Sequence, residues 1–147
     1  NEGKMSETPM SHTARSKCAI ANGLEVLGDK WTLLIVRDLM FTDRNQFCHL
    51  QQASEGISTN ILTERLTRLQ NYRIIEKLPH PTHGKKFIYQ LTEQGIALFP
   101  VLVEFMLWAR EAIDGCFIPP AIYEPMVHDR DTLYRKVKRR EPLVKLV

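Results

Sequence analysis

The 147-residue sequence contains few cysteines and no long apolar run. Its three cysteines, Cys18, Cys48 and Cys116, are odd in number and far apart, which argues against a disulfide framework and favours a reducing compartment. No stretch of 18 apolar residues occurs, so no membrane span is expected. Residues 1–15 are polar, lack the apolar core of a secretory signal, and are expected to be disordered. These absences together predict a cytoplasmic protein.

The sequence also lacks the local motifs of catalysis, phosphate binding and structural metal binding. It contains no G-x-S-x-G sequence, which would mark a serine nucleophile, and no glycine-rich phosphate loop. Five histidines are present, but neither His49 beside Cys48 nor the pair His80 and His83 has a partner at zinc-site spacing. We therefore expect no catalytic residue, no metal site and no cofactor.

The positive charge is concentrated in one part of the chain, although the net charge is only +3. Residues 58–90 contain six lysines and arginines against two glutamates, whereas residues 91–115 contain one arginine against four acidic residues. A polyanionic partner is one explanation of such a cluster, and a solvated surface that is basic by chance is the alternative.

The apolar pattern predicts four helices in the first half of the chain. Helical spacing of apolar residues follows Cys18 and ends at Gly28, and Asp29 is a candidate N-cap for a second helix through Trp31 and Leu39. A short helix over 46–53 and a turn near Gly56 come next. Ser58 is a plausible N-cap for a helix that extends to about residue 71.

The period then changes from helical to alternating. The segments 73–78 and 85–91 read as two strands joined by a turn rich in proline, histidine and glycine. Thr92 is expected to cap one helix over 93–115, kinked at Pro100. Three prolines interrupt the pattern afterwards, and residues 116–147 form a basic C-terminal extension that ends in either a helix or a loose tail.

This order of elements predicts the fold class. A short helix, a turn, a second helix and a hairpin form a winged helix-turn-helix, so we expect a mainly α-helical domain with a small β-hairpin over residues 16–115. In that unit the second helix enters the major groove of DNA, and the hairpin lies over the backbone. The final helix then serves dimerisation.

The helix over 58–71 has an unusual outer face. Leu62, Leu66 and Leu69 mark its core side, and the opposite side carries mostly short hydrogen-bonding side chains. Such side chains can read base edges, whereas the bland alternative is an ordinary exposed helix. Together with the hairpin lysines, the predicted DNA-binding residues are Ser58, Thr59, Asn60, Thr63, Glu64, Thr67, Arg68, Lys85 and Lys86.

The helix over 93–115 is apolar on nearly all sides, which one small domain cannot bury alone. A second copy of the chain is the simplest cover, and the predicted dimer contacts are Leu98, Val101, Leu102, Phe105 and Trp108. Two-fold symmetry predicts that the bound double-stranded DNA is an inverted-repeat operator.

Several quoted segments together resemble the HxlR-type winged helix-turn-helix regulators, which are related to the MarR group. They are "GDKW", "LLIVRDL", "FCHLQQASEGISTNILTERLTRLQ", "IIEK", "YQLTEQG" and "LFPVLVEFMLWA", and the resemblance covers about residues 16–115. The hairpin "HPTHGKKFIY" departs from the family pattern, with lysines in place of an arginine. The resemblance implies a homodimeric DNA-binding transcription regulator, often a repressor.

The resemblance also places Cys18 where some members carry a redox- or electrophile-sensing cysteine. A helix N-terminus that follows Arg15 and Lys17 favours the thiolate. The alternative is that Cys18 is a small, inert packing residue.

The alternative to a DNA-reading regulator is a winged-helix module that binds another protein. Only the first predicts steep salt dependence and loss of binding when Asn60 or Arg68 is replaced. The sequence does not reveal the identity of a small-molecule effector.

Overall fold

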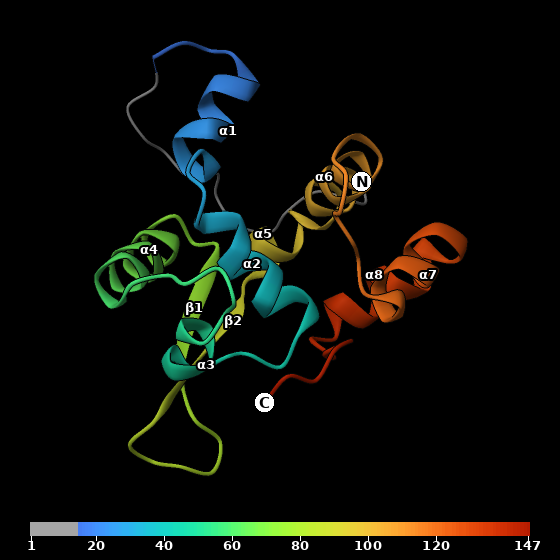
Figure 1. Cartoon of the computed structure of the whole chain (residues 1–147). Coiled ribbons are helices and arrows are strands. Elements are labelled where there is room, and N and C mark those ends of the chain that lie inside the picture. Colours follow the sequence, from blue (N-terminus) through green and yellow to red (C-terminus); the bar gives the residue numbers. More distant parts are fainter. Residues whose placement is uncertain (1–14) are drawn as a thin grey trace.

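The computed structural model describes residues 15–147 (Figure 1). It is mainly helical with one antiparallel hairpin among the described residues, which confirms the expected fold class. The predicted disorder of residues 1–15 falls, except for Arg15, outside this range. The elements in chain order are α1 (Ala19–Leu27), α2 (Thr32–Phe41), α3 (Phe47–Gln51), α4 (Thr59–Asn71), β1 (Ile75–Pro79), β2 (Phe87–Leu91), α5 (Glu93–Ile96), α6 (Phe99–Ala112), α7 (Pro120–His128) and α8 (Arg130–Lys138).

A tight corner at Gly28 joins α1 to α2. A Cβ atom at this position would lie 2.2 Å from the Leu24 carbonyl oxygen, so only glycine fits without a backbone shift. Helix α1 projects from the rest of the molecule (Figure 1), and Val26 is its only buried residue. The position of α1 therefore depends on the corner and on few packing contacts.

Helices α3 and α4 and the turn between them form the helix-turn-helix. Gly56, in the turn before α4, has a φ of 77°, which favours glycine. The guanidinium group of Arg37 on α2 donates two hydrogen bonds, of 2.8 and 3.1 Å, to the Glu55 carboxylate in the same turn. Burial alone would lower the pKa of Arg37, but the bonds to Glu55 and Asp38 raise it. The contact between Arg37 and Glu55 therefore fixes the turn ahead of α4.

The hairpin pairs Ile75 with Leu91 at its base and Pro79 with Phe87 near its tip. Ile75, Tyr89 and Leu91 are buried against the helices, which agrees with the alternation predicted from the sequence, whereas Phe87, predicted on the same face as Tyr89 and Leu91, is exposed. The backbone N–H of Tyr89 also donates to the Asn45 carbonyl at 2.7 Å, so β2 is tied to the segment that leads into α3.

The expected single helix over 93–115 is wrong in this structure. The chain forms a short helix, α5, and then a separate helix, α6, which ends at Ala112. Pro100 lies in the first turn of α6, where its missing N–H leaves no intrahelical hydrogen bond unmade. The proline therefore begins a helix instead of kinking one.

The C-terminal extension is folded and forms part of the core. Ile122 and Met126 of α7 and Leu133 and Val137 of α8 are buried in the same cluster as residues of α2, α4 and both strands. Of the two alternatives expected for the end of the chain, the helix is therefore correct. The ring of Tyr134 on α8 also stacks on Phe99 of α6, with ring centroids 4.9 Å apart.

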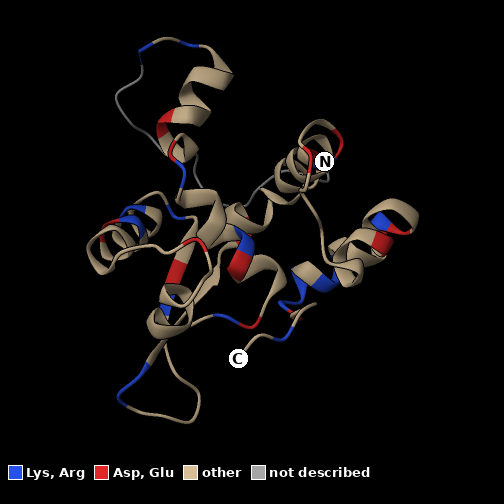
Figure 2. Ribbon diagram, in the orientation of Figure 1, with Lys and Arg blue, Asp and Glu red and all other residues tan. Residues whose placement is uncertain are grey.

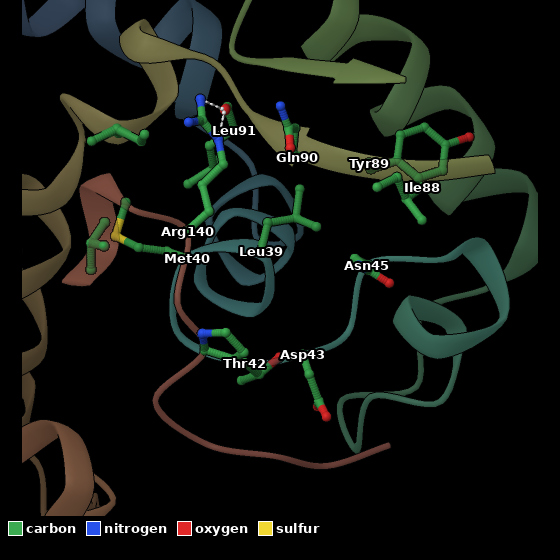
Figure 3. A pocket seen from close by; sticks show the side chains of 13 residues that line it. Leu39, Met40, Thr42, Asp43, Asn45, Ile88, Tyr89, Gln90, Leu91 and Arg140 are labelled. Atoms are coloured by element: carbon green, nitrogen blue, oxygen red, sulfur yellow. Dashed lines mark hydrogen bonds between the residues drawn. The ribbon is translucent and has the colours of Figure 1, made fainter. Parts of the chain in front are cut away.

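After α8 the chain returns to the winged helix and closes a cavity there (Figure 3). Arg140 donates from Nε and Nη2 to the Leu91 carbonyl oxygen, at 3.2 and 2.8 Å. The backbone N–H groups of Leu143 and Val144 donate to the Phe41 carbonyl oxygen. The cavity, of about 150 Å³, lies between the end of α2, strand β2 and these C-terminal residues.

Within residues 15–147, no helix is both long and apolar enough to cross a membrane.

Candidate nucleic-acid interface

Helix α4 presents most of the predicted DNA-binding residues to solvent. Its apolar side, Leu62, Leu66 and Leu69, is buried as predicted. The exposed members of the predicted set are Ser58, Thr59, Asn60, Thr63, Glu64, Thr67, Lys85 and Lys86. Seen as a ribbon, α4 lies along one side of the molecule, and the hairpin loop projects beyond the same side (Figure 1).

Several polar groups on this surface are engaged within the chain. The Ser58 hydroxyl accepts a hydrogen bond from the Ile61 N–H at 3.3 Å, which is the predicted N-cap. The Thr59 hydroxyl accepts from Gln51 on α3 at 2.5 Å, and the Thr67 hydroxyl donates to the Thr63 carbonyl at 3.0 Å. Glu64 pairs with Arg65. The Ser58 and Thr59 contacts fix the start of α4 and its spacing from α3.

The amide of Asn60 makes no hydrogen bond to any residue in the described range 15–147. It lies one residue inside the N-terminus of α4 and is exposed, as is Thr63 one turn later. In helix-turn-helix proteins the first residues of the second helix contact the base edges. An unoccupied amide at this position can form a bidentate pair with adenine.

Arg68 does not extend away from the protein as the helix-face analysis predicts. Its Nη2 donates to the carbonyl oxygens of Glu25 at 3.1 Å and Val26 at 3.5 Å, at the end of α1. The same atom lies 3.8 Å from the Asp29 carboxylate. Arg68 is thus half-buried against the α1–α2 corner, because its long side chain folds back over the helix flank.

Asp29 is the centre of this corner. Its carboxylate accepts from the N–H groups of Trp31 at 2.8 Å and Thr32 at 3.0 Å, so it binds the start of α2, although the N-cap residue is Trp31 and not Asp29 as predicted. It also accepts from Arg65 Nε at 3.0 Å. Partial burial alone would raise the pKa of Asp29, but the hydrogen bonds from Thr32, Trp31 and Arg65 lower it to about 2. The carboxylate is therefore ionised at neutral pH.

The hairpin loop adds a second basic surface. His80 Nδ1 accepts hydrogen bonds from the N–H groups of Thr82 and His83, at 3.1 and 3.2 Å, and these contacts shape the loop. Lys85 and Lys86 are exposed, and neither forms an ion pair within the described part of the chain. Figure 2 shows basic residues on this loop, on α4 and on α8, with acidic residues between them. Two exposed ammonium groups on the hairpin loop suit contact with a polyanion.

Histidine at the start of α3 has a structural role. His49 Nδ1 lies 3.4 Å from the N–H groups of both Asn45 and Gln46, and the Gln46 side chain completes a capping box with it. Burial is the largest cause of its lowered pKa, which favours the neutral acceptor form. Among residues 15–147, no group of three or more possible metal ligands is found.

A second exposed surface is apolar and lies away from α4. Val101, Phe105 and Trp108 on α6 are 46%, 53% and 60% exposed, and the rings of the last two stack with centroids 6.4 Å apart. Ile20 and Leu24 on α1 are also exposed. Of the other predicted dimer contacts, Leu102 is buried in the chain's own core and Leu98 is half-buried, so neither belongs to this exposed apolar strip.

The sequence analysis missed two features of this surface. It did not single out Arg65, and it did not predict that Asp29 links α2 to α4. The signal for Asp29 was present in "GDKW", where it was predicted as a cap only. Arg65 lies between the core side and the outer side of α4, at a helical angle that the outer-face pattern leaves out. Neither role can be read from one helix, because each depends on a contact between elements distant in the sequence.

Comparison with known proteins agrees with this architecture. Residues 26–116 match the model of the HxlR-like helix-turn-helix family. The chain is 31% identical over 116 residues to Rv3095, an uncharacterized HTH-type transcriptional regulator of Mycobacterium tuberculosis, covering 79% of this chain and 72% of that one. It is 35% identical over 88 residues to the HTH-type transcriptional regulator YodB of Bacillus subtilis, covering 60% of this chain and 78% of that one.

Solved structures give the same result. The reduced form of YodB matches with a TM-score of 0.56 and 33% identity, covering 67% of this chain and 97% of that one. PA1607, solved as a candidate transcription factor, matches with a TM-score of 0.62 and 35% identity, covering 71% and 70% of the two chains. The family match covers more than half of the sequence and includes the helix-turn-helix, the hairpin and α6. The chain therefore belongs to the HxlR-like helix-turn-helix family and is a transcription regulator of that type.

Proposed function

We propose that this regulator is a homodimer that reads a specific DNA sequence and represses transcription by occupying its operator. The observation that carries the proposal is the exposed amide of Asn60, near the start of the second helix of the helix-turn-helix and without a hydrogen-bond partner in residues 15–147. Thr63 lies beside it on the same face and offers a methyl group for contact with thymine. Together they form a surface suited to base edges.

The hairpin supplies the part of the affinity that does not depend on sequence. Lys85 and Lys86 are exposed on the hairpin loop and would contact phosphates, releasing counterions from the DNA. Ser58 and Thr59 hold the N-terminus of α4 in place through their hydroxyl groups, so their contribution to binding is structural as well as direct. Because the proposed partner is DNA, the protein belongs in the compartment of the chromosome, which is the cytoplasm in the bacterial relatives.

Dimerisation is supported by the exposed apolar strip on α6. Three large apolar side chains in one strip, each about half exposed, are costly to leave in water and are suited to a second copy of the chain. A two-fold axis through such a contact would present two α4 helices to DNA. The operator expected is an inverted repeat with half-sites about one helical turn apart.

Replacing Asn60 by alanine is expected to weaken binding by about 1–3 kcal/mol for each half-site and to relax the preference at one base pair in each half-site. The measurement is selection of binding sites from a random duplex library, followed by titration of the selected duplex. Asn71→Ala is the matched control, since Asn71 is also exposed on α4 but lies at its last turn. It should bind nearly as well as the unchanged protein.

The outcome of the library selection separates this function from the alternative of a protein-interaction module. Enrichment of an inverted repeat supports the proposed function. If the unchanged protein enriched no sequence, the interaction module would be favoured instead.

Cys18 is proposed as a site at which oxidants or electrophiles weaken DNA binding. It is exposed at the N-cap of α1, and its N–H donates to the Ser16 hydroxyl at 3.1 Å. The solved form of YodB is described as reduced, which favours redox chemistry in a relative. Hydrogen peroxide would convert the Cys18 thiolate to sulfenic acid and release hydroxide.

Treatment with hydrogen peroxide is expected to lower operator affinity, and Cys18→Ser to abolish that loss. Because Cys48 and Cys116 are also exposed, Cys48→Ser and Cys116→Ser are the matched controls and should remain sensitive. Sensitivity that persisted in Cys18→Ser would assign the response to another thiol.

A further inference from the structure

The recognition helix is tied to α1 by one side chain. Arg68 lies in the last turns of α4, and its Nη2 donates to the Glu25 and Val26 carbonyl oxygens at the C-terminal end of α1. These are carbonyl groups that a helix leaves without intrahelical partners, and the end of a helix favours a cation. The contact therefore suits a guanidinium group both by hydrogen bonding and by charge.

Asp29 contacts two arginines of α4 as well as the start of α2. One carboxylate oxygen accepts from Arg65 Nε at 3.0 Å, and the other lies 3.8 Å from Arg68 Nη2. The same carboxylate binds the first N–H groups of α2. One residue thus links the start of α2, the end of α1 and the flank of α4, and the hydrogen bonds that lower its pKa keep it charged although the side chain is only 20% exposed.

We propose that Arg68 and Asp29 are positioning residues of the DNA-binding surface, which couple the orientation of α1 to that of α4, and that Arg68 is not a phosphate contact. The inference rests on the proposed DNA-binding function. Its physical basis is that α1 has one buried residue of its own, so the Arg68 contact supplies much of what holds it against α4.

The Arg68 contact therefore couples the exposed residues of α1 to the exposed face of α4. Helix α1 carries exposed Ile20 and Leu24, as well as Cys18, whereas α4 carries Asn60 and Thr63. A change in how α1 packs would alter the Arg68 contact and so the setting of α4. In Figure 1, α1 projects from the rest of the molecule, so the chain corner at Gly28 and Asp29 and the Arg68 contact join it to the body.

The test measures operator affinity against salt concentration for Arg68→Ala, Asp29→Asn and the double variant, with Lys85→Ala as a control for a phosphate contact. We expect Arg68→Ala and Asp29→Asn each to weaken binding about tenfold. The slope of log affinity against log salt should stay at its original value in both. In Lys85→Ala the slope should become shallower by about 1.8, because each phosphate contact contributes about 0.9 and the proposed dimer loses one contact in each subunit. The double variant should be little weaker than either single variant, because both break one connection.

A slope that became shallower by about 1.8 in Arg68→Ala, as expected for Lys85→Ala, would show a direct phosphate contact in each subunit and overturn the proposal. So would strictly additive losses in the double variant. Asparagine is a good capping residue, so Asp29→Asn is expected to keep α2 intact and remains informative even if Arg68→Ala unfolds.

Hydrogen exchange of the free protein provides a readout that does not depend on DNA. Arg68→Ala should increase exchange in both α1 and the C-terminal half of α4. Unchanged protection in both helices would overturn the proposed link even if no operator were found. The failure of the DNA-binding function and the failure of this link are therefore distinguishable.

Discussion

Replacing Leu133 by alanine is expected to lower the free energy of unfolding by about 2–5 kcal/mol. Leu133 is completely buried, although it lies in α8, beyond the residues that match the family. Its removal would leave a cavity in the cluster that includes Phe41 of α2 and Phe99 of α6. The effect should be as large as for a core residue of the winged helix itself, because one cluster contains both parts.

Denaturant unfolding followed by circular dichroism measures this change. Lys136→Ala is the matched control, since Lys136 is exposed on the same helix and should change stability by no more than about 0.5 kcal/mol. A loss below about 1 kcal/mol in Leu133→Ala would show that α8 is only loosely attached. Two separate unfolding transitions would show that the extension is an independent unit.

Replacing Phe105 by glutamate is expected to convert the proposed dimer to a monomer and to weaken operator binding by roughly a hundredfold or more, since two linked half-site contacts become one. Phe105 is 53% exposed, so the charge is tolerated in the folded monomer. In the dimer it would be buried without a partner, at a high cost in free energy.

Sedimentation and DNA titration measure these effects. Glu111→Ala, on the same helix and exposed, is the control and should leave both the mass and the affinity unchanged. A Phe105→Glu protein that remained dimeric would place the interface elsewhere. A monomer that kept full affinity would mean that one α4 helix suffices for binding.

The local sequence predicted the helix-turn-helix and the hairpin well, because both are encoded by short-range patterns. The leucine spacing in α4, the N-cap at Ser58 and the alternation in β2 are each satisfied within a few residues. The family match and the relatives show that the chain is a transcription regulator and not an enzyme, as the sequence analysis predicted. The prediction of one helix over 93–115 was wrong because a continuous apolar run does not show that the helix is interrupted ahead of Pro100.

The sequence by itself determined which face of α4 is apolar, which polar residues lie opposite, and where positive charge gathers. Periodicity and composition are properties of neighbouring residues, so one sequence suffices for them. Only the tertiary structure decided that Arg68 turns back to the carbonyl groups of α1, that Leu102 is buried in its own chain, and that α8 completes the core. Each of these depends on contacts between residues distant in the sequence, where packing and hydrogen bonding select among positions that periodicity leaves equivalent.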